Sequence, residues 1–185
     1  AGGLTALLQP HAKKLLAAST SAHYGLMFVA VGAGYPEIAL LHLVAHAALK
    51  ALLFLSAGIA GRQAVSFHLT KMGFGRVLPV TALATAVGGL ALAGIPPLGA
   101  AWTKEMVVTA AGHFSPWLAF AVMLAGALSA AYAMRFVYSA YGPSANDISA
   151  TSRTTETIAT GSLAAATLAL ALLWLPGIQQ ALGGW

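Results

Sequence analysis

Residues 36–61 read PEIALLHLVAHAALKALLFLSAGIAG, and this stretch decides the class of fold. After Glu37 near its start, the only formal charge in the stretch is Lys50. About 20 predominantly apolar residues are enough for a helix to cross the hydrocarbon core of a bilayer. The stretch therefore predicts a membrane-spanning helix that carries a lysine close to its middle.

The composition extends this interpretation to the whole chain. Of the 185 residues, 59% are hydrophobic and 7% are charged, whereas an ordinary soluble domain carries roughly 25% charged residues. No segment alternates in polarity as the strands of a membrane barrel do. We therefore expect an all-α, polytopic membrane helix bundle that forms a single membrane domain over residues 1–185. The chain has no cysteine, so it cannot hold a cysteine-ligated zinc ion or iron–sulfur cluster, and we expect no cofactor or metal.

The windows without charge predict about five spans. They lie near residues 15–34, 36–61, 77–114, 116–141 and 156–175. Residues 1–10 resemble the tail of a preceding apolar helix and show neither an initiator Met nor the basic region of a signal peptide. We expect that the N-terminal part of a longer subunit is missing from this chain.

The basic residues predict an orientation. Seven of the nine Lys and Arg residues lie on one side of the predicted bundle: before the first span, between the second and third spans, and beside the connection of the fourth and fifth spans. They are Lys13, Lys14, Arg62, Lys71, Arg76, Arg135 and Arg153. Short loops rich in Lys and Arg stay on the cytoplasmic side of a membrane. We therefore expect a bacterial-type inner membrane protein with its N-terminal end in the cytoplasm and its C-terminus outside. The basic residues of these cytoplasmic loops account for the net charge of +5. We therefore do not expect a nucleic acid as a partner.

His42, His46 and Lys50 recur every four residues, which places them on one helix face over about 12 Å. A charged side chain at the bilayer centre costs at least ~2.5 kcal/mol, so such residues usually mark a transport pathway. Because imidazole titrates near pH ~6.5, this row predicts a proton relay. The alternative is a purely structural set of hydrogen bonds between helices. Metal binding by the two histidines is disfavoured because no Glu or Cys completes the ligand set.

The apolar stretch 77–114 is too long for one crossing. As a single helix it would measure roughly 57 Å against a hydrocarbon core of about 30 Å. It must break at Pro96-Pro97, where two backbone donors are missing. Broken helices at membrane depth build ion sites in transporters, and Lys104 follows the break. We expect Thr103 to cap the second half-helix and Glu105 to lie in its first turn. The alternative is a kink needed only for packing, with Lys104 reaching water.

The first span opens with the polar residues Ser19, Thr20, Ser21 and His23. We expect these to make hydrogen bonds between helices, and His23 could also extend a proton path. His11, His68 and His113 lie near expected loops or helix ends and are predicted to be surface groups.

Three segments resemble one known family. Residues 42–58, HLVAHAALKALLFLSAG, are similar to the HLxxHAxFKALLFLxAG signature of the antiporter-like subunits of respiratory complex I and of Mrp-type sodium/proton antiporters. Gln9 to Met27 resembles their QxDxKRxLAYSTxSQxGxM stretch, and Leu92 to Glu105 resembles LALAGxPPLAGFWSK followed by an acid. The departures mostly reduce side-chain bulk: Ala18 replaces Tyr, Ala22 replaces Ser, His23 replaces Gln, Leu49 replaces Phe, and Ala100-Ala101 replace Gly-Phe.

The resemblance implies a fold and a set of roles. The family has fourteen helices in two inverted halves, and this chain looks like the C-terminal half, from the tail of the ninth helix onward. The family's proton path implies that Lys50 is the central relay, His42 and His46 are its bridges, and Lys104 is the outlet. The implied partners are other membrane subunits, the chain's own N-terminal half, lipid, and protons or Na+.

The expected function is proton translocation through the membrane arm of a complex I-like NADH:quinone oxidoreductase, by a subunit that performs no redox chemistry itself. The expected relay residues are Lys50, Lys104, His46, His42, Glu105 and His23. One alternative is an Mrp-type cation/proton antiporter, which Glu at position 105 in place of Asp slightly favours. An alternative of another class is a non-conducting membrane scaffold for a peripheral enzyme.

Overall fold

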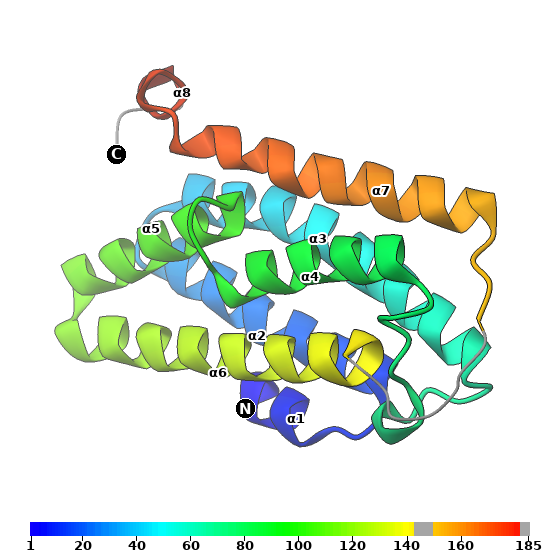
Figure 1. Ribbon diagram of the computed structural model, residues 1–185. Coiled ribbons are helices and arrows are strands. Elements are labelled where there is room, and N and C mark those ends of the chain that lie inside the picture. Colours follow the sequence, from blue (N-terminus) through cyan, green and yellow to red (C-terminus); the bar gives the residue numbers. More distant parts are fainter. Residues whose placement is uncertain (143–149, 182–185) are drawn as a thin grey trace.

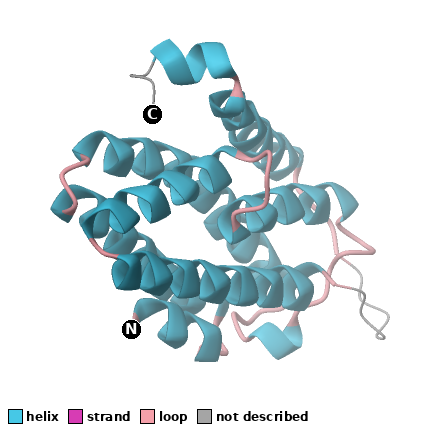
Figure 2. Cartoon of the chain, turned by 90° about the vertical axis from the view of Figure 1, so that its left-hand side faces the viewer, coloured by secondary structure: helices cyan, strands magenta, loops and turns pink. Residues whose placement is uncertain are grey.

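The structure is a computed structural model that describes residues 1–142 and 150–181. Every regular element in these ranges is a helix (Figures 1 and 2). The elements are α1 (Gly2–Leu8), α2 (Ala12–Gly32), α3 (Pro36–Gln63), η1 (Leu69–Lys71), α4 (Pro79–Ala93), α5 (Gly99–Phe114), α6 (Pro116–Tyr141), α7 (Thr154–Ala169), η2 (Leu170–Trp174) and α8 (Pro176–Ala181). Part of the expected connection between the last two spans, and the C-terminal end of the expected domain, lie outside the described residues.

Four helical segments are long and apolar enough to cross a membrane. They are Ala12–Gly32, Pro36–Gln63, Pro116–Tyr141 and Thr154–Trp174. The remaining predicted span, residues 77–114, is the broken one, because the shorter α4 and α5 follow each other on either side of the Pro96-Pro97 pair. The prediction of a multi-pass helix bundle with one broken helix is therefore confirmed.

The break is built from glycine and proline. Gly94 ends α4 in the left-handed conformation, with φ of +86°, which glycine adopts without the steric penalty of a side chain. Helix α5 begins directly after Leu98. Within α4 the carbonyl of Leu92 would normally accept a bond from the residue four positions later, but that residue is Pro96, which has no N–H. The break therefore leaves a backbone acceptor free at the end of α4.

Helix α4 fits closely between α3 and α6 because two adjacent glycines face them. A Cβ atom at Gly88 would lie 3.0 Å from the Leu52 and Leu53 side chains of α3, and one at Gly89 would lie 2.2 Å from Val137 of α6. Small residues let membrane helices approach each other in this way. The close approach packs α4 against α3, which carries Lys50, and against α6.

Several contacts gather the ends of α2, α3 and α7 at one end of the bundle (Figure 1). The Lys13 ammonium lies 4.0 Å from the centre of the Phe67 ring, and Arg62 at the end of α3 pairs with Glu156 of α7 at 2.6 Å. Arg135 instead lies within α6 and donates to two carbonyl groups at the end of α1. This end of the bundle therefore carries basic residues from several helices.

Candidate functional site

The two lysines predicted inside spans are buried in the bundle. Lys50 of α3 is 6% exposed and Lys104 of α5 is 9% exposed. The Lys50 ammonium donates to the Leu16 carbonyl at 2.9 Å and to the Ser19 hydroxyl at 2.5 Å, both on α2. Among the described residues neither lysine forms an ion pair with a carboxylate. Each positive charge is therefore held by neutral oxygen atoms alone.

The helix break makes the site of Lys104. Its ammonium donates to the Leu92 carbonyl at 2.6 Å and to the Ser129 hydroxyl of α6 at 2.5 Å. The Leu92 carbonyl is the acceptor that Pro96 leaves free. Gly94 provides the space, because a Cβ atom there would lie 3.0 Å from Cδ and 3.3 Å from Nζ of the lysine. The proline pair and the glycine thus create both the acceptor and the room for a buried ammonium.

Three imidazole rings from α2 and α3 form a cluster near the lysines. His23 Nδ1 lies 3.0 Å from His42 Nε2, and His42 Nδ1 lies 2.8 Å from the Thr103 hydroxyl of α5. The His23 ring stacks on His42 with centroids 5.2 Å apart and on His46 with centroids 4.7 Å apart. In the described ranges, no group of three or more His, Cys, Asp or Glu side chains is arranged to hold a metal ion. The cluster is instead a hydrogen-bonded and stacked row that links α2, α3 and α5.

Two histidine nitrogens in this cluster are buried without a hydrogen-bond partner among the described residues. They are Nε2 of His23 and Nε2 of His46. A neutral imidazole has one donor and one acceptor nitrogen, so each ring can still take or give a hydrogen bond on the free side. Such free positions are where water or an arriving proton could be bound.

The predicted roles of Thr103 and Glu105 at the start of α5 were wrong. The helix begins at Gly99, Leu98 is its N-cap, and no acidic residue lies in its first turn. Thr103 is therefore inside the helix, where its hydroxyl donates to the Ala100 carbonyl and contacts a histidine instead of capping. The error came from placing the helix start too far beyond the proline pair.

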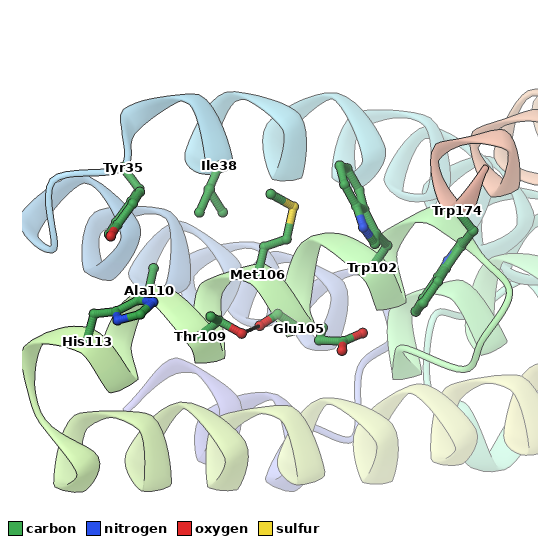
Figure 3. A pocket seen from close by; sticks show the side chains of 9 residues that line it. All are labelled: Tyr35, Ile38, Trp102, Glu105, Met106, Thr109, Ala110, His113 and Trp174. Atoms are coloured by element: carbon green, nitrogen blue, oxygen red, sulfur yellow. Dashed lines mark hydrogen bonds between the residues drawn. The ribbon is translucent and has the colours of Figure 1, made fainter. Parts of the chain in front are cut away.

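Glu105 is exposed and lines a cavity whose lining residues include neither of the buried lysines (Figure 3). The cavity has a volume of about 550 Å³ and lies between the start of α3, the outer face of α5 and η2. Trp102 and Trp174 contribute its aromatic wall, and His113 lies at its far end (Figure 3). His113 and His68 are exposed as predicted, whereas His11 is half-buried against a phenylalanine ring.

Ser19 and Ser129 belong to the site although the sequence did not predict them there. Ser19 was expected to make hydrogen bonds between helices, which it does, but its partner is the Lys50 ammonium. Ser129 was not singled out, although a hydroxyl in the apolar helix α6 is itself a signal of a polar partner. The buried site therefore comprises two lysine–serine pairs and one histidine cluster.

Comparison with known proteins agrees with these observations. Residues 1–130 match the family described as NADH:quinone oxidoreductase/Mrp antiporter, transmembrane. NADH-ubiquinone oxidoreductase chain 5 of Mus musculus is 34% identical over 139 residues, which are 73% of this chain and 23% of that protein. The same subunit of Halichoerus grypus is 36% identical over 139 residues, with the same coverage. The chain thus spans about a quarter of the length of these relatives.

Two solved structures share the fold. The membrane-bound sulfane sulfur reductase, an archaeal respiratory membrane complex, has a chain that matches with a TM-score of 0.82 at 22% identity, covering 99% of this chain and 39% of that one. Respiratory complex I from Thermus thermophilus with bound NADH matches with a TM-score of 0.82 at 23% identity, covering 98% of this chain and 39% of that one. Both matches confirm the antiporter-like helix bundle. Because the family match covers well over half of the residues, this chain belongs to the transmembrane NADH:quinone oxidoreductase/Mrp antiporter family.

Proposed function

We propose that this chain carries protons through the membrane arm of a complex I-type NADH:quinone oxidoreductase and performs no redox chemistry itself. The observation that supports this proposal is the pair of buried ammonium groups, Lys50 and Lys104, each held by neutral oxygens. Burying a charge without an opposite charge is expensive. A lysine that passes protons must alternate between the ammonium and the neutral amine, and a site without a carboxylate allows both forms. If the position were purely structural, an apolar side chain would fill it without the free-energy cost of burying a charge.

In this proposal Lys50 is the central relay and Lys104 is the outlet. The carbonyl and hydroxyl acceptors stabilise each lysine while it is charged, and the same groups impose little penalty when it is neutral. The cluster of His23, His42 and His46 supplies groups that bind a proton on one nitrogen and release one from the other. Charge changes in neighbouring parts of the complex would shift the proton affinity of the lysines in turn.

In this proposal Glu105 lies on the outlet side of the proton path, after Lys104. It follows Lys104 in α5, is exposed, and faces the cavity lined by Trp102 and Trp174. A carboxylate there can take up a proton or attract a cation after it leaves the buried lysine. This position also supports the second candidate function, a cation/proton antiporter of the Mrp type, because Na+ prefers oxygen ligands.

The proposed partners are other membrane subunits, the chain's own N-terminal half, and lipid. Large apolar side chains such as Phe28, Leu83 and Trp117 are 70% or more exposed, which suits contact with lipid or with another membrane helix. We further propose that the basic end of the bundle faces the cytoplasm of a bacterial-type inner membrane, since basic loop residues remain inside.

Replacement of Lys50 by Ala tests the proposed function in the full-length subunit within its complex. Proton uptake by sealed membrane vesicles during NADH oxidation is measured together with assembly of the complex. We expect uptake to be lost while assembly is retained. Lys71→Ala is the matched control, because Lys71 is an exposed lysine of η1 outside the spans. Normal uptake by Lys50→Ala would favour a scaffold, and uptake that depends on Na+ would favour the antiporter.

A further inference from the structure

We infer that Thr103 of α5 fixes which ring nitrogens of His42 and His23 carry hydrogen, so that His23 presents a bare Nε2 to an arriving proton. Thr103 acts here as a positioning residue, because its hydroxyl is bonded to His42 and to its own helix. The inference rests on the proposed function for the arrival of a proton. The hydrogen positions themselves are a property of the site and can be measured without any transport.

The Thr103 hydroxyl is the fixed end of the hydrogen-bonded row. The side chain has no exposed surface, and its hydroxyl oxygen lies 3.2 Å from the Ala100 carbonyl oxygen and 2.8 Å from His42 Nδ1. A hydroxyl has one hydrogen to donate and accepts at its lone pairs. Because a carbonyl can only accept, the bond to Ala100 uses the hydrogen of the hydroxyl. A lone pair of the Thr103 oxygen is left for His42.

The hydrogen positions of both rings follow from this end. Since Thr103 accepts, His42 Nδ1 carries hydrogen, and a neutral His42 is then bare at Nε2. That nitrogen lies 3.0 Å from His23 Nδ1, so His23 Nδ1 must donate. A neutral His23 is in turn bare at Nε2, which is buried without a partner among the described residues. Every bond of the row therefore points the same way, from His23 towards the Ala100 carbonyl.

The opposite arrangement leaves the row less well satisfied. With Thr103 donating to His42 Nδ1, His42 Nε2 would donate to His23 Nδ1, and His23 would carry its hydrogen on Nε2. The part of the chain that the structure describes offers no acceptor to that buried N–H group. Buried N–H donors without a partner are rarer in protein backbones than under-used acceptors, and the same cost of desolvation applies to an imidazole. The first arrangement leaves only a lone pair unused.

This polarity decides what a proton meets at His23. The lone pair of a bare Nε2 can form an N–H bond with a proton, and the resulting imidazolium keeps its Nδ1–H bond to His42. In the opposite arrangement Nε2 already carries hydrogen and cannot take another. Thr103 therefore determines, through His42, whether His23 Nε2 can bind a proton.

The hydrogen positions can be measured by ¹⁵N NMR of the full-length subunit within its complex, with labelled histidine and well above pH ~6.5, where free imidazole titrates. A nitrogen that carries hydrogen and a bare nitrogen resonate far apart, and spectra of His23→Gln and His42→Gln assign the two rings. In the wild type we expect hydrogen on Nδ1 and a bare Nε2 in both rings. Hydrogen on Nε2 of either ring would overturn the inference, whatever proton uptake shows.

Thr103→Val keeps the shape of the side chain and removes the hydroxyl. Both arrangements of the row then leave one donor and one acceptor unpaired, so hydrogen should appear on Nε2 of both rings in a share of the molecules. If half of the molecules cannot accept a proton at His23, the apparent proton affinity of the row falls about twofold, and proton uptake by sealed vesicles should slow. Thr103→Ser keeps the hydroxyl and should show the wild-type spectrum and wild-type uptake.

Thr167→Val is the matched control. Thr167 of α7 is 2% exposed, and its hydroxyl donates to the Leu163 carbonyl of its own helix, so the wild-type spectrum and uptake should persist. A wild-type spectrum in Thr103→Val would overturn the positioning role, and so would a changed spectrum with wild-type uptake. If Thr103→Val does not assemble, the wild-type spectrum still decides the polarity. Wild-type uptake in Lys50→Ala would instead overturn the proposed function and leave the hydrogen positions as the spectrum gives them.

Discussion

Replacement of Gly94 by Ala should disturb the outlet lysine without touching any ionisable residue. Gly94 has φ of +86°, and a side chain in that left-handed conformation costs about 1–2 kcal/mol. The new Cβ atom would also lie 3.0 Å from Cδ and 3.3 Å from Nζ of Lys104. The lysine side chain must therefore give by a few tenths of an ångström, and we expect this shift to weaken the 2.6 Å bond from its ammonium to the Leu92 carbonyl.

Two measurements follow this change in the full-length subunit within its complex. The free energy of unfolding in detergent should fall by about 1–2 kcal/mol from the backbone conformation alone, and proton uptake by sealed vesicles should slow. Gly161→Ala in α7 is the matched control, since a Cβ atom there meets nothing within 4 Å and Ala favours the helix. Equal stability and equal uptake in the two variants would refute the account of the Lys104 site.

Three further substitutions have distinct expected outcomes. Ser129→Ala removes one acceptor of a buried ammonium, so vesicle assays should show slower proton uptake with the complex still assembled. Tyr141→Phe removes a buried hydrogen bond to the Ser56 carbonyl; denaturation should show a loss of about 1 kcal/mol in unfolding free energy, with normal uptake. Arg62→Gln breaks an ion pair with Glu156 in which the arginine is 41% exposed, so stability should change by less than about 1 kcal/mol.

The broken helix and the buried lysines could be predicted because their causes are local. Two adjacent prolines stop a helix wherever they occur, and the stretch that contains Pro96 was too long for one crossing. Lys50 lies too far from either end of its span for its charge to reach water easily. Both conclusions follow from a few neighbouring residues and the thickness of a bilayer.

The partners of the lysines could not be predicted, because they depend on how helices pack. Ser19 is 31 positions from Lys50, and Ser129 is 25 positions from Lys104. Their meeting depends on the rotation and axial shift of α2 and α6, which no local pattern specifies. The start of α5 was misplaced for a related reason, since the path of the chain between Gly94 and Gly99 is set by packing as well as by proline.

The central claim, that a buried lysine passes protons, is tested most directly by the number of protons moved per NADH oxidised. Lys50→Met keeps an unbranched side chain of similar length and removes the ammonium. In sealed vesicles that contain the assembled complex, we predict a clear fall in this ratio relative to the wild type. An unchanged ratio would contradict the account, because protons would then cross without the ammonium of Lys50.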